Sequence, residues 1–135
     1  MDNVVFEIND YYELLNLHKA LLEARFHEGL EDRYLAGSPI VAEIHSRIIK
    51  NLISMEIDKK GNETWSEWIK ISNRKDYLEI SVKNIIKFET WDKETNKYEI
   101  VKTYISPFTA TDKEIDEIIE YINTVEEHYD KQRVL

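Results

Sequence analysis

Cysteine is absent from this chain of 135 residues, and glycine and proline are scarce. Without cysteine there is no disulfide framework, no thiolate zinc site, no iron–sulfur cluster and no cysteine nucleophile. The three glycines, at positions 29, 37 and 61, are too far apart to form a glycine-rich phosphate-binding loop. With only two prolines besides, the chain has little material for a flexible linker, so we predict one domain over residues 1–135.

The sequence also lacks long hydrophobic runs. No apolar stretch approaches the roughly 20 residues that a membrane-spanning helix needs. The first residues, Met1-Asp2-Asn3, have neither the basic nor the apolar region of a signal peptide. We therefore predict a cytoplasmic protein that does not bind membranes.

Positive charge is in deficit, because 18 Lys and Arg stand against 27 Asp and Glu, for a net charge of −9. Such a charge repels nucleic acid backbones and anionic membrane surfaces, and it speeds encounter with a basic protein. Acidity of this degree is also ordinary for a solvated surface. The sequence thus argues against nucleic acid as a partner and favours a basic protein.

Two helices are predicted in the first part of the chain. Apolar residues recur at helical spacing from Asn9 to about Glu28, where Gly29 is a suitable helix end. A second helix is expected to begin at Ser38-Pro39, a capping residue followed by proline at the first helical position. Because about ten residues separate the two, we predict an antiparallel helical hairpin.

Residues 77–105 look β-rich. Leu78, Ile80 and Val82 alternate with polar residues, and residues 85–91 and 98–105 flank the polar segment 92–97, which is typical of a hairpin connection. That hairpin would pair Asp92 with Lys97, and Trp91 with Tyr98. Residues 65–71 favour another strand. Two alternatives stay open: a capping box at residues 64–67 that opens a short helix, and a helix across residues 76–84.

The last region predicts an amphipathic helix. Thr111 and Glu114 form a capping box, and Ile115, Ile118 and Ile122 follow at spacings of three and four. The expected fold class is α+β, in which the helical hairpin and this closing helix pack on an antiparallel sheet of about four strands.

The acidic residues of the closing helix are the main candidate for a binding surface. Carboxylates in its first turn are stabilised by the helix dipole, whereas those near its C-terminal end are mildly unfavourable there. On a strand, Trp65 and Trp68 would face opposite sides, which would leave one of them exposed as an interface anchor. The predicted partner-binding residues are Trp68, Glu117, Glu120, Glu126, Glu127 and Asp130.

The four histidines do not indicate a metal site or a catalytic site. His18 and His27 are nine residues apart, on opposite sides of an ideal helix. His18 and His45 lie within or beside apolar stripes, so we predict that each is a buried, hydrogen-bonded core residue. No zinc-protease, calcium-loop or nucleophile-elbow motif is present. No catalytic residue, metal or cofactor is therefore predicted, and an enzyme is disfavoured.

Two functional hypotheses remain. The leading one is a non-catalytic protein-interaction domain, in one version an immunity-like or antitoxin-like protein that neutralises a basic toxin or nuclease. The alternative is a small enzyme or ligand-binding protein with a cleft between the helical hairpin and the sheet, where His18 and His45 would be the candidate residues. A monomer and a homodimer are both compatible with the sequence.

Overall fold

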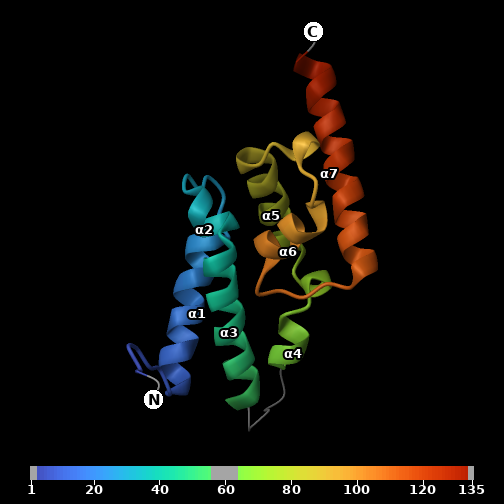
Figure 1. The fold of residues 1–135 in the computed structure, drawn as a ribbon. Coiled ribbons are helices and arrows are strands. Elements are labelled where there is room, and N and C mark those ends of the chain that lie inside the picture. Colours follow the sequence, from blue (N-terminus) through green and yellow to red (C-terminus); the bar gives the residue numbers. More distant parts are fainter. Residues whose placement is uncertain (1–2, 56–63, 134–135) are drawn as a thin grey trace.

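The structure, a computed structural model, describes residues 3–55 and 64–133, and the regular elements of these residues are helices joined by loops (Figure 1). The prediction of an α+β fold is wrong, because the described residues form no sheet and their β-structure is a single isolated bridge between Lys70 and Thr109. The α-helices are α1 (Tyr11–Arg25), α2 (Arg33–Gly37), α3 (Pro39–Met55), α4 (Trp65–Trp68), α5 (Lys75–Phe88), α6 (Lys97–Ile105) and α7 (Asp112–Arg133). The 3-10 helices are η1 (Ile71–Asn73) and η2 (Trp91–Lys93).

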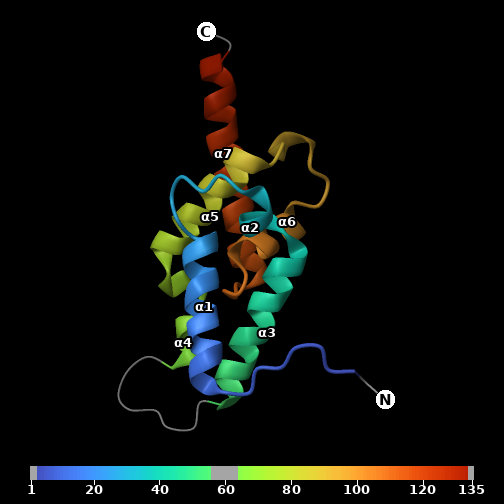
Figure 2. The ribbon, with the colours of Figure 1, turned by 90° about the vertical axis from the view of Figure 1, so that its left-hand side faces the viewer.

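The predicted helical hairpin is confirmed. Helices α1 and α3 pack side by side, and their connection contains the short helix α2 (Figure 2). Asp10 caps α1, since its carboxylate accepts a hydrogen bond of 3.0 Å from the Glu13 amide. Gly29 in the connection has a φ of +78°, a left-handed conformation that glycine adopts without strain.

The segment predicted as a strand over residues 65–71 forms α4 and η1 instead. The alternative short helix is the one that forms, with Thr64 as its N-cap, because the Thr64 hydroxyl accepts a hydrogen bond of 3.2 Å from the Glu67 amide. On a helix, residues three apart lie on the same face. Trp65 and Trp68 therefore both point toward α1, where each packs edge to face against His18.

The strand predicted from Leu78, Ile80 and Val82 is also wrong, because these residues belong to α5. The buried positions of α5 follow helical spacing and include two polar residues, Ser81 and Asn84. Polar residues on the buried face broke the apolar pattern that would have indicated a helix. The alternation of Leu78, Ile80 and Val82 with polar residues is therefore not evidence of a strand, because all three belong to the helix α5.

The predicted hairpin over residues 85–105 becomes the end of α5, η2 and α6. The side chain of Asn96 accepts a hydrogen bond of 3.2 Å from the Glu99 amide and so begins a helix within the expected strand. The expected cross-strand pairs are replaced by other contacts. Trp91 is buried, and its indole donates a hydrogen bond of 2.7 Å to Asn123 of α7.

The closing helix and its capping box are confirmed. The Glu114 amide donates to the Thr111 hydroxyl at 3.1 Å, and the Thr111 amide donates to the Glu114 carboxylate at 2.8 Å. Helix α7 packs on α5, α6 and η2 rather than on a sheet, and its C-terminal half extends beyond the other helices (Figure 1). Among the residues that the structure describes, no helix is long and apolar enough to cross a membrane.

Two groups of buried side chains form the core. The larger group lies between α5, α6 and α7 and includes Ile85, Val101 and Ile122, each fully buried. The smaller group lies inside the α1–α3 hairpin, around Leu52. Trp68 packs against both groups, so α4 joins the hairpin to the C-terminal helices.

Candidate functional site

A groove of about 580 Å³ lies between α5 and α7. Helix α6 packs against both of these helices and contributes no residue to the groove, which therefore opens on the side away from α6. Each helix presents residues spaced by three and four, that is, one helical face. The α5–α7 groove is lined by Ile71, Ser72, Lys75, Asp76, Leu78, Glu79, Val82, Glu114, Glu117, Ile118 and Tyr121.

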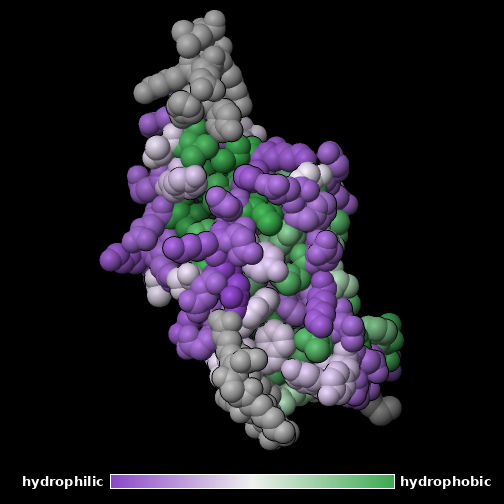
Figure 3. Space-filling view, turned by 180° about the vertical axis from the view of Figure 1, so that it is seen from behind, coloured by the Kyte–Doolittle hydropathy of each residue, from purple (hydrophilic) through white to green (hydrophobic). Residues whose placement is uncertain are grey.

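The groove has an apolar floor and a largely acidic edge. Its floor is formed by Ile71, Leu78, Val82 and Ile118. Seen from behind, the molecule shows hydrophobic side chains at the surface along α7, bordered by hydrophilic ones (Figure 3). Tyr121, 58% exposed, stands at one end of the groove. An apolar surface left open beside charged groups is typical of an interaction site.

Carboxylates outnumber cations along the groove. Asp76, Glu79, Glu114 and Glu117 line it together with a single cation, Lys75. Glu114 is half-buried and already accepts the Thr111 amide, whereas the side chains of Asp76, Glu79 and Glu117 are exposed. Such an arrangement attracts positive charge while its floor removes apolar side chains from water.

The predicted partner-binding residues are only partly brought together. Glu117 lines the α5–α7 groove, but Glu120 lies on α7 outside it, and Glu126 and Glu127 follow further along the same helix. Asp130 is in α7, but its side chain falls outside the described part of the chain. Trp68 is half-buried between the two core groups, against His18 and Phe108, and does not line the groove.

The sequence did not predict the floor of the groove. Leu78 and Val82 were assigned to a strand, on which they would share a face with Ile80. On helix α5 they are four residues apart and share a face with Lys75 and Glu79. The four-residue spacing of Leu78 and Val82 can be read in the sequence, but it places them on one face only if the segment is a helix.

His18 and His45 are buried and hydrogen-bonded, as predicted. His18 is 2% exposed, His45 is fully buried, and His18 Nδ1 lies 2.9 Å from His45 Nε2. Burial and the nearby Lys19 charge lower the pKa of His18 to about 4. Burial, and then the charges of Arg25 and His18, lower the pKa of His45 to about 3. Both imidazoles are therefore neutral at neutral pH.

Arg25 completes this network and was not singled out in the sequence. Its guanidinium is 1% exposed and donates to the backbone carbonyls of Leu35, Ala36, Thr103 and Ser106, and Nη1 lies 3.1 Å from His45 Nδ1. These carbonyls belong to the C-terminal ends of α2 and α6, where the negative ends of the helix dipoles favour a cation. Arg25 lies seven residues after His18 and shares its face of α1, a spacing that indicates burial.

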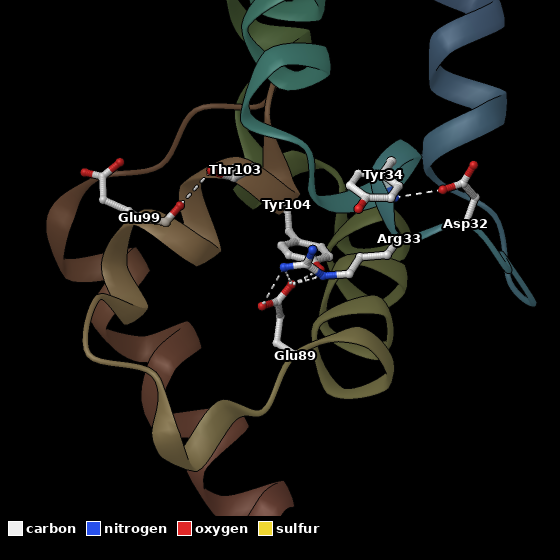
Figure 4. A network of polar contacts seen from close by, with 7 residues as sticks. All are labelled: Asp32, Arg33, Tyr34, Glu89, Glu99, Thr103 and Tyr104. Atoms are coloured by element: carbon white, nitrogen blue, oxygen red, sulfur yellow. Dashed lines mark hydrogen bonds and ion pairs between the residues drawn. The ribbon is translucent and has the colours of Figure 1, made fainter.

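A second polar network borders a hollow of about 570 Å³ between α2, the start of α3, and α6 (Figure 4). Glu89 accepts hydrogen bonds of 3.0 and 3.3 Å from Arg33 and one of 2.6 Å from the Tyr104 hydroxyl. Burial and then this bond raise the pKa of Tyr104 well above its usual range. At Gly37 an added Cβ would lie 2.5 Å from that hydroxyl, so only glycine permits this approach. The network orders the side chains around the hollow and ties α2 to α6.

We expect Tyr104→Phe to lower the free energy of unfolding by about 2 kcal/mol, because it removes a buried hydrogen bond to a carboxylate. Tyr98→Phe is the matched control. Tyr98 makes a bond of the same length, 2.6 Å, to the exposed Asp112, so its removal should cost clearly less than the removal of the Tyr104 bond. Urea denaturation of both variants measures the difference. Equal losses would show that the Tyr104–Glu89 bond gains nothing from its burial.

No metal-binding group of three or more histidines or acidic residues occurs in the described ranges. Comparison of the chain with protein-family models, with curated proteins and with solved structures finds no match. The function is therefore inferred from the geometry of the described residues alone.

Proposed function

We propose that this protein is a non-catalytic interaction domain that binds an amphipathic, basic segment of a partner protein in the α5–α7 groove. The observation that supports this proposal is the combination of an apolar floor with an edge of four carboxylates and one cation. A basic amphipathic helix would place leucine-like side chains on the floor and lysine or arginine beside Asp76, Glu79 and Glu117.

The two parts of the groove have different roles in this proposal. Burial of apolar side chains on the floor supplies most of the binding free energy. The carboxylates supply selectivity and a faster association, assisted by the net charge of −9. Tyr121 has the size and exposure of an interface anchor.

A basic toxin or nuclease is the partner class that fits this chemistry best, which makes the protein immunity-like or antitoxin-like. Binding would be stoichiometric and would not alter the partner covalently. The encounter would take place in the cytoplasm, the compartment that the sequence predicts. This version extends the basic-segment proposal and depends on it.

The proposal is tested with a synthetic helical peptide of leucine and lysine and the full-length protein. We expect Glu117→Lys to weaken peptide binding by about five- to tenfold, because it reverses one charge at the edge of the groove. Glu120→Lys is the matched control, since it makes the same change on the same helix outside the groove. Isothermal titration calorimetry at two salt concentrations measures both variants.

The comparison between the two variants decides the outcome. Weaker binding for Glu117→Lys alone, with an affinity that falls as salt rises, supports the α5–α7 groove as the site. Equal weakening by both substitutions would indicate attraction to the overall charge and would contradict a specific groove. A peptide of leucine and glutamate that binds as tightly as the leucine–lysine peptide would also contradict the proposal.

A further inference from the structure

A separate cavity of about 250 Å³ lies where α1 meets α4, and it shares no residue with the α5–α7 groove. This His18 cavity is lined by Leu15, His18, Lys19, Leu22, Trp65 and Trp68. Its volume is below the range of sites for drug-sized molecules, so any occupant is small.

The hydrogen-bond chain behind the cavity fixes the proton positions on both histidines. A guanidinium only donates, so His45 Nδ1 must accept from Arg25. A neutral His45 then has its proton on Nε2 and donates it to His18 Nδ1. A neutral His18 must in turn have its proton on Nε2. The chain therefore ends in an N–H donor on the far edge of the His18 ring.

This last N–H is open to the cavity. No described residue is hydrogen-bonded to His18 Nε2, and none of the fully buried side-chain nitrogens of the described part of the chain is without a partner. Nε2 must then reach the 2% of His18 surface that remains exposed, and His18 lines this cavity. A donor of a side chain that is otherwise buried is thus directed into the cavity.

The walls around this donor are aromatic and positively charged. The rings of His18, Trp65 and Trp68 meet edge to face, with centroids 5.1 to 5.5 Å apart. Lys19 is exposed at the cavity, which has no carboxylate among its lining residues. The carboxylate of α4, Glu67, is paired with Lys70 at 3.0 Å.

We infer that the His18 cavity is a binding site for a small aromatic carboxylate. The carboxylate would accept the His18 Nε2–H and lie beside the Lys19 ammonium, while its ring contacts Leu15 and the two tryptophans. The buried charge of Arg25, two hydrogen bonds away, polarises this donor toward an anion. A metal ion is a poor occupant, since the protonated Nε2 has no free lone pair. A cationic ligand would be repelled by Lys19.

Benzoate is the probe, and nitrogen-15 NMR of the histidine side chains is the measurement. In the free protein we expect His18 to be the neutral tautomer with its proton on Nε2. Benzoate should shift this signal saturably at millimolar concentration, whereas the neutral analogue benzamide should bind about fivefold more weakly. A proton on Nδ1, no saturable shift, or equal affinities for the two compounds would overturn the inference.

Three variants locate the site without removing the buried histidines. Lys19→Gln should weaken benzoate binding by about three- to fivefold and leave benzamide binding unchanged. Lys50→Gln, an exposed change on α3 away from the cavity, should leave both affinities unchanged. Leu15→Trp should fill the cavity and abolish binding while circular dichroism shows the helices intact. Unchanged benzoate binding in Leu15→Trp, or equal effects of the two lysine variants, would overturn the site.

Because the probes and residues differ from those of the α5–α7 groove, the two proposals fail or succeed separately. A loss of peptide binding in Glu117→Lys leaves the benzoate measurement untouched. A protein that binds benzoate but no peptide would be a ligand-binding protein without the proposed partner.

Discussion

Arg25→Met should destabilise the protein by about 4 kcal/mol or more, the largest effect that we expect from a single substitution. Methionine fills similar space but donates no hydrogen bond. Four backbone carbonyls and His45 Nδ1 would lose their donor inside the core. Each buried polar group left without a partner costs about 1–3 kcal/mol. Local rearrangement recovers part of the total cost of these five acceptors.

The effect is large because Arg25 connects four helices. Its guanidinium, which belongs to α1, bonds the last carbonyls of α2 and α6 and the imidazole of α3. Burial lowers its pKa to about 10, so it remains charged at neutral pH. No ion pair among the described residues involves Arg25, and the helix ends take the place of a carboxylate.

Two matched variants separate charge from geometry. Arg25→Lys retains the charge but replaces five donors in a planar fork by three on one nitrogen, so we expect an intermediate loss. Arg47→Met removes an exposed arginine of α3 and should cost less than about 1 kcal/mol. Guanidinium denaturation measures all three. A loss for Arg25→Met no greater than that for Arg47→Met would contradict a structural role for the network.

The parts of the fold that could be predicted are those whose signals are local. Helices α1, α3 and α7 have capping residues and apolar faces within one continuous segment. The capping box of Thr111 and Glu114, for example, needs no residue outside the first turn of α7. These helices would be assigned correctly whatever they packed against.

Residues 64–105 were assigned wrongly because their helices depend on distant partners. Ser81 and Asn84 lie on the buried face of α5. The Asn84 amide donates to the carbonyl of Arg25, 59 residues away, and the Ser81 hydroxyl, which donates to Tyr77 of its own helix at 2.9 Å, packs 3.4 Å from the carbonyl of Tyr104, 23 residues away. Without these partners a serine and an asparagine indicate an exposed face. The β-branched residues of the same segments then favoured strands, although packing overrides such preferences.

The candidate sites show the same division. The burial of His18 and His45 follows from the apolar pattern of their own helices. Their contact with each other joins residues 27 apart in the sequence, and only the packing of α1 on α3 creates it. The α5–α7 groove needs both the helical assignment of α5 and its position beside α7. The candidate binding sites therefore depend on how the helices pack together, which the local sequence pattern does not predict.

Acidification should destabilise the protein well before its carboxylates are protonated. Between about pH 7 and pH 5 we expect the free energy of unfolding to fall by about 4 kcal/mol, roughly half from each buried histidine. Denaturant titrations at closely spaced pH values measure this slope. It should reach about 2.5 kcal/mol per pH unit near pH 5.5, which corresponds to nearly two protons taken up on unfolding.

The direction follows from the lowered pKa values of the two histidines. In the unfolded chain a histidine titrates near 6.5, whereas in the folded protein the pKa of His18 is about 4 and that of His45 about 3. Between these values the unfolded state binds more protons, so stability is lost as the pH falls below about 6.5. The pKa of Glu28 is lowered by its hydrogen bond and ion pair with Lys83. This exposed carboxylate therefore changes the stability of the protein only at a pH below the range from 7 to 5.

His18→Asn isolates the contribution of one member of the pair. The asparagine carbonyl can accept the His45 Nε2–H in place of His18 Nδ1, but it has no proton to gain in this range. The variant should be less stable at neutral pH because it loses the ring packing against Trp65 and Trp68. Its slope near pH 5.5 should nevertheless fall to about 1 kcal/mol per pH unit. An unchanged slope would mean that His18 is protonated equally in both states, and the neutral hydrogen-bond chain that directs its N–H into the cavity would then be wrong.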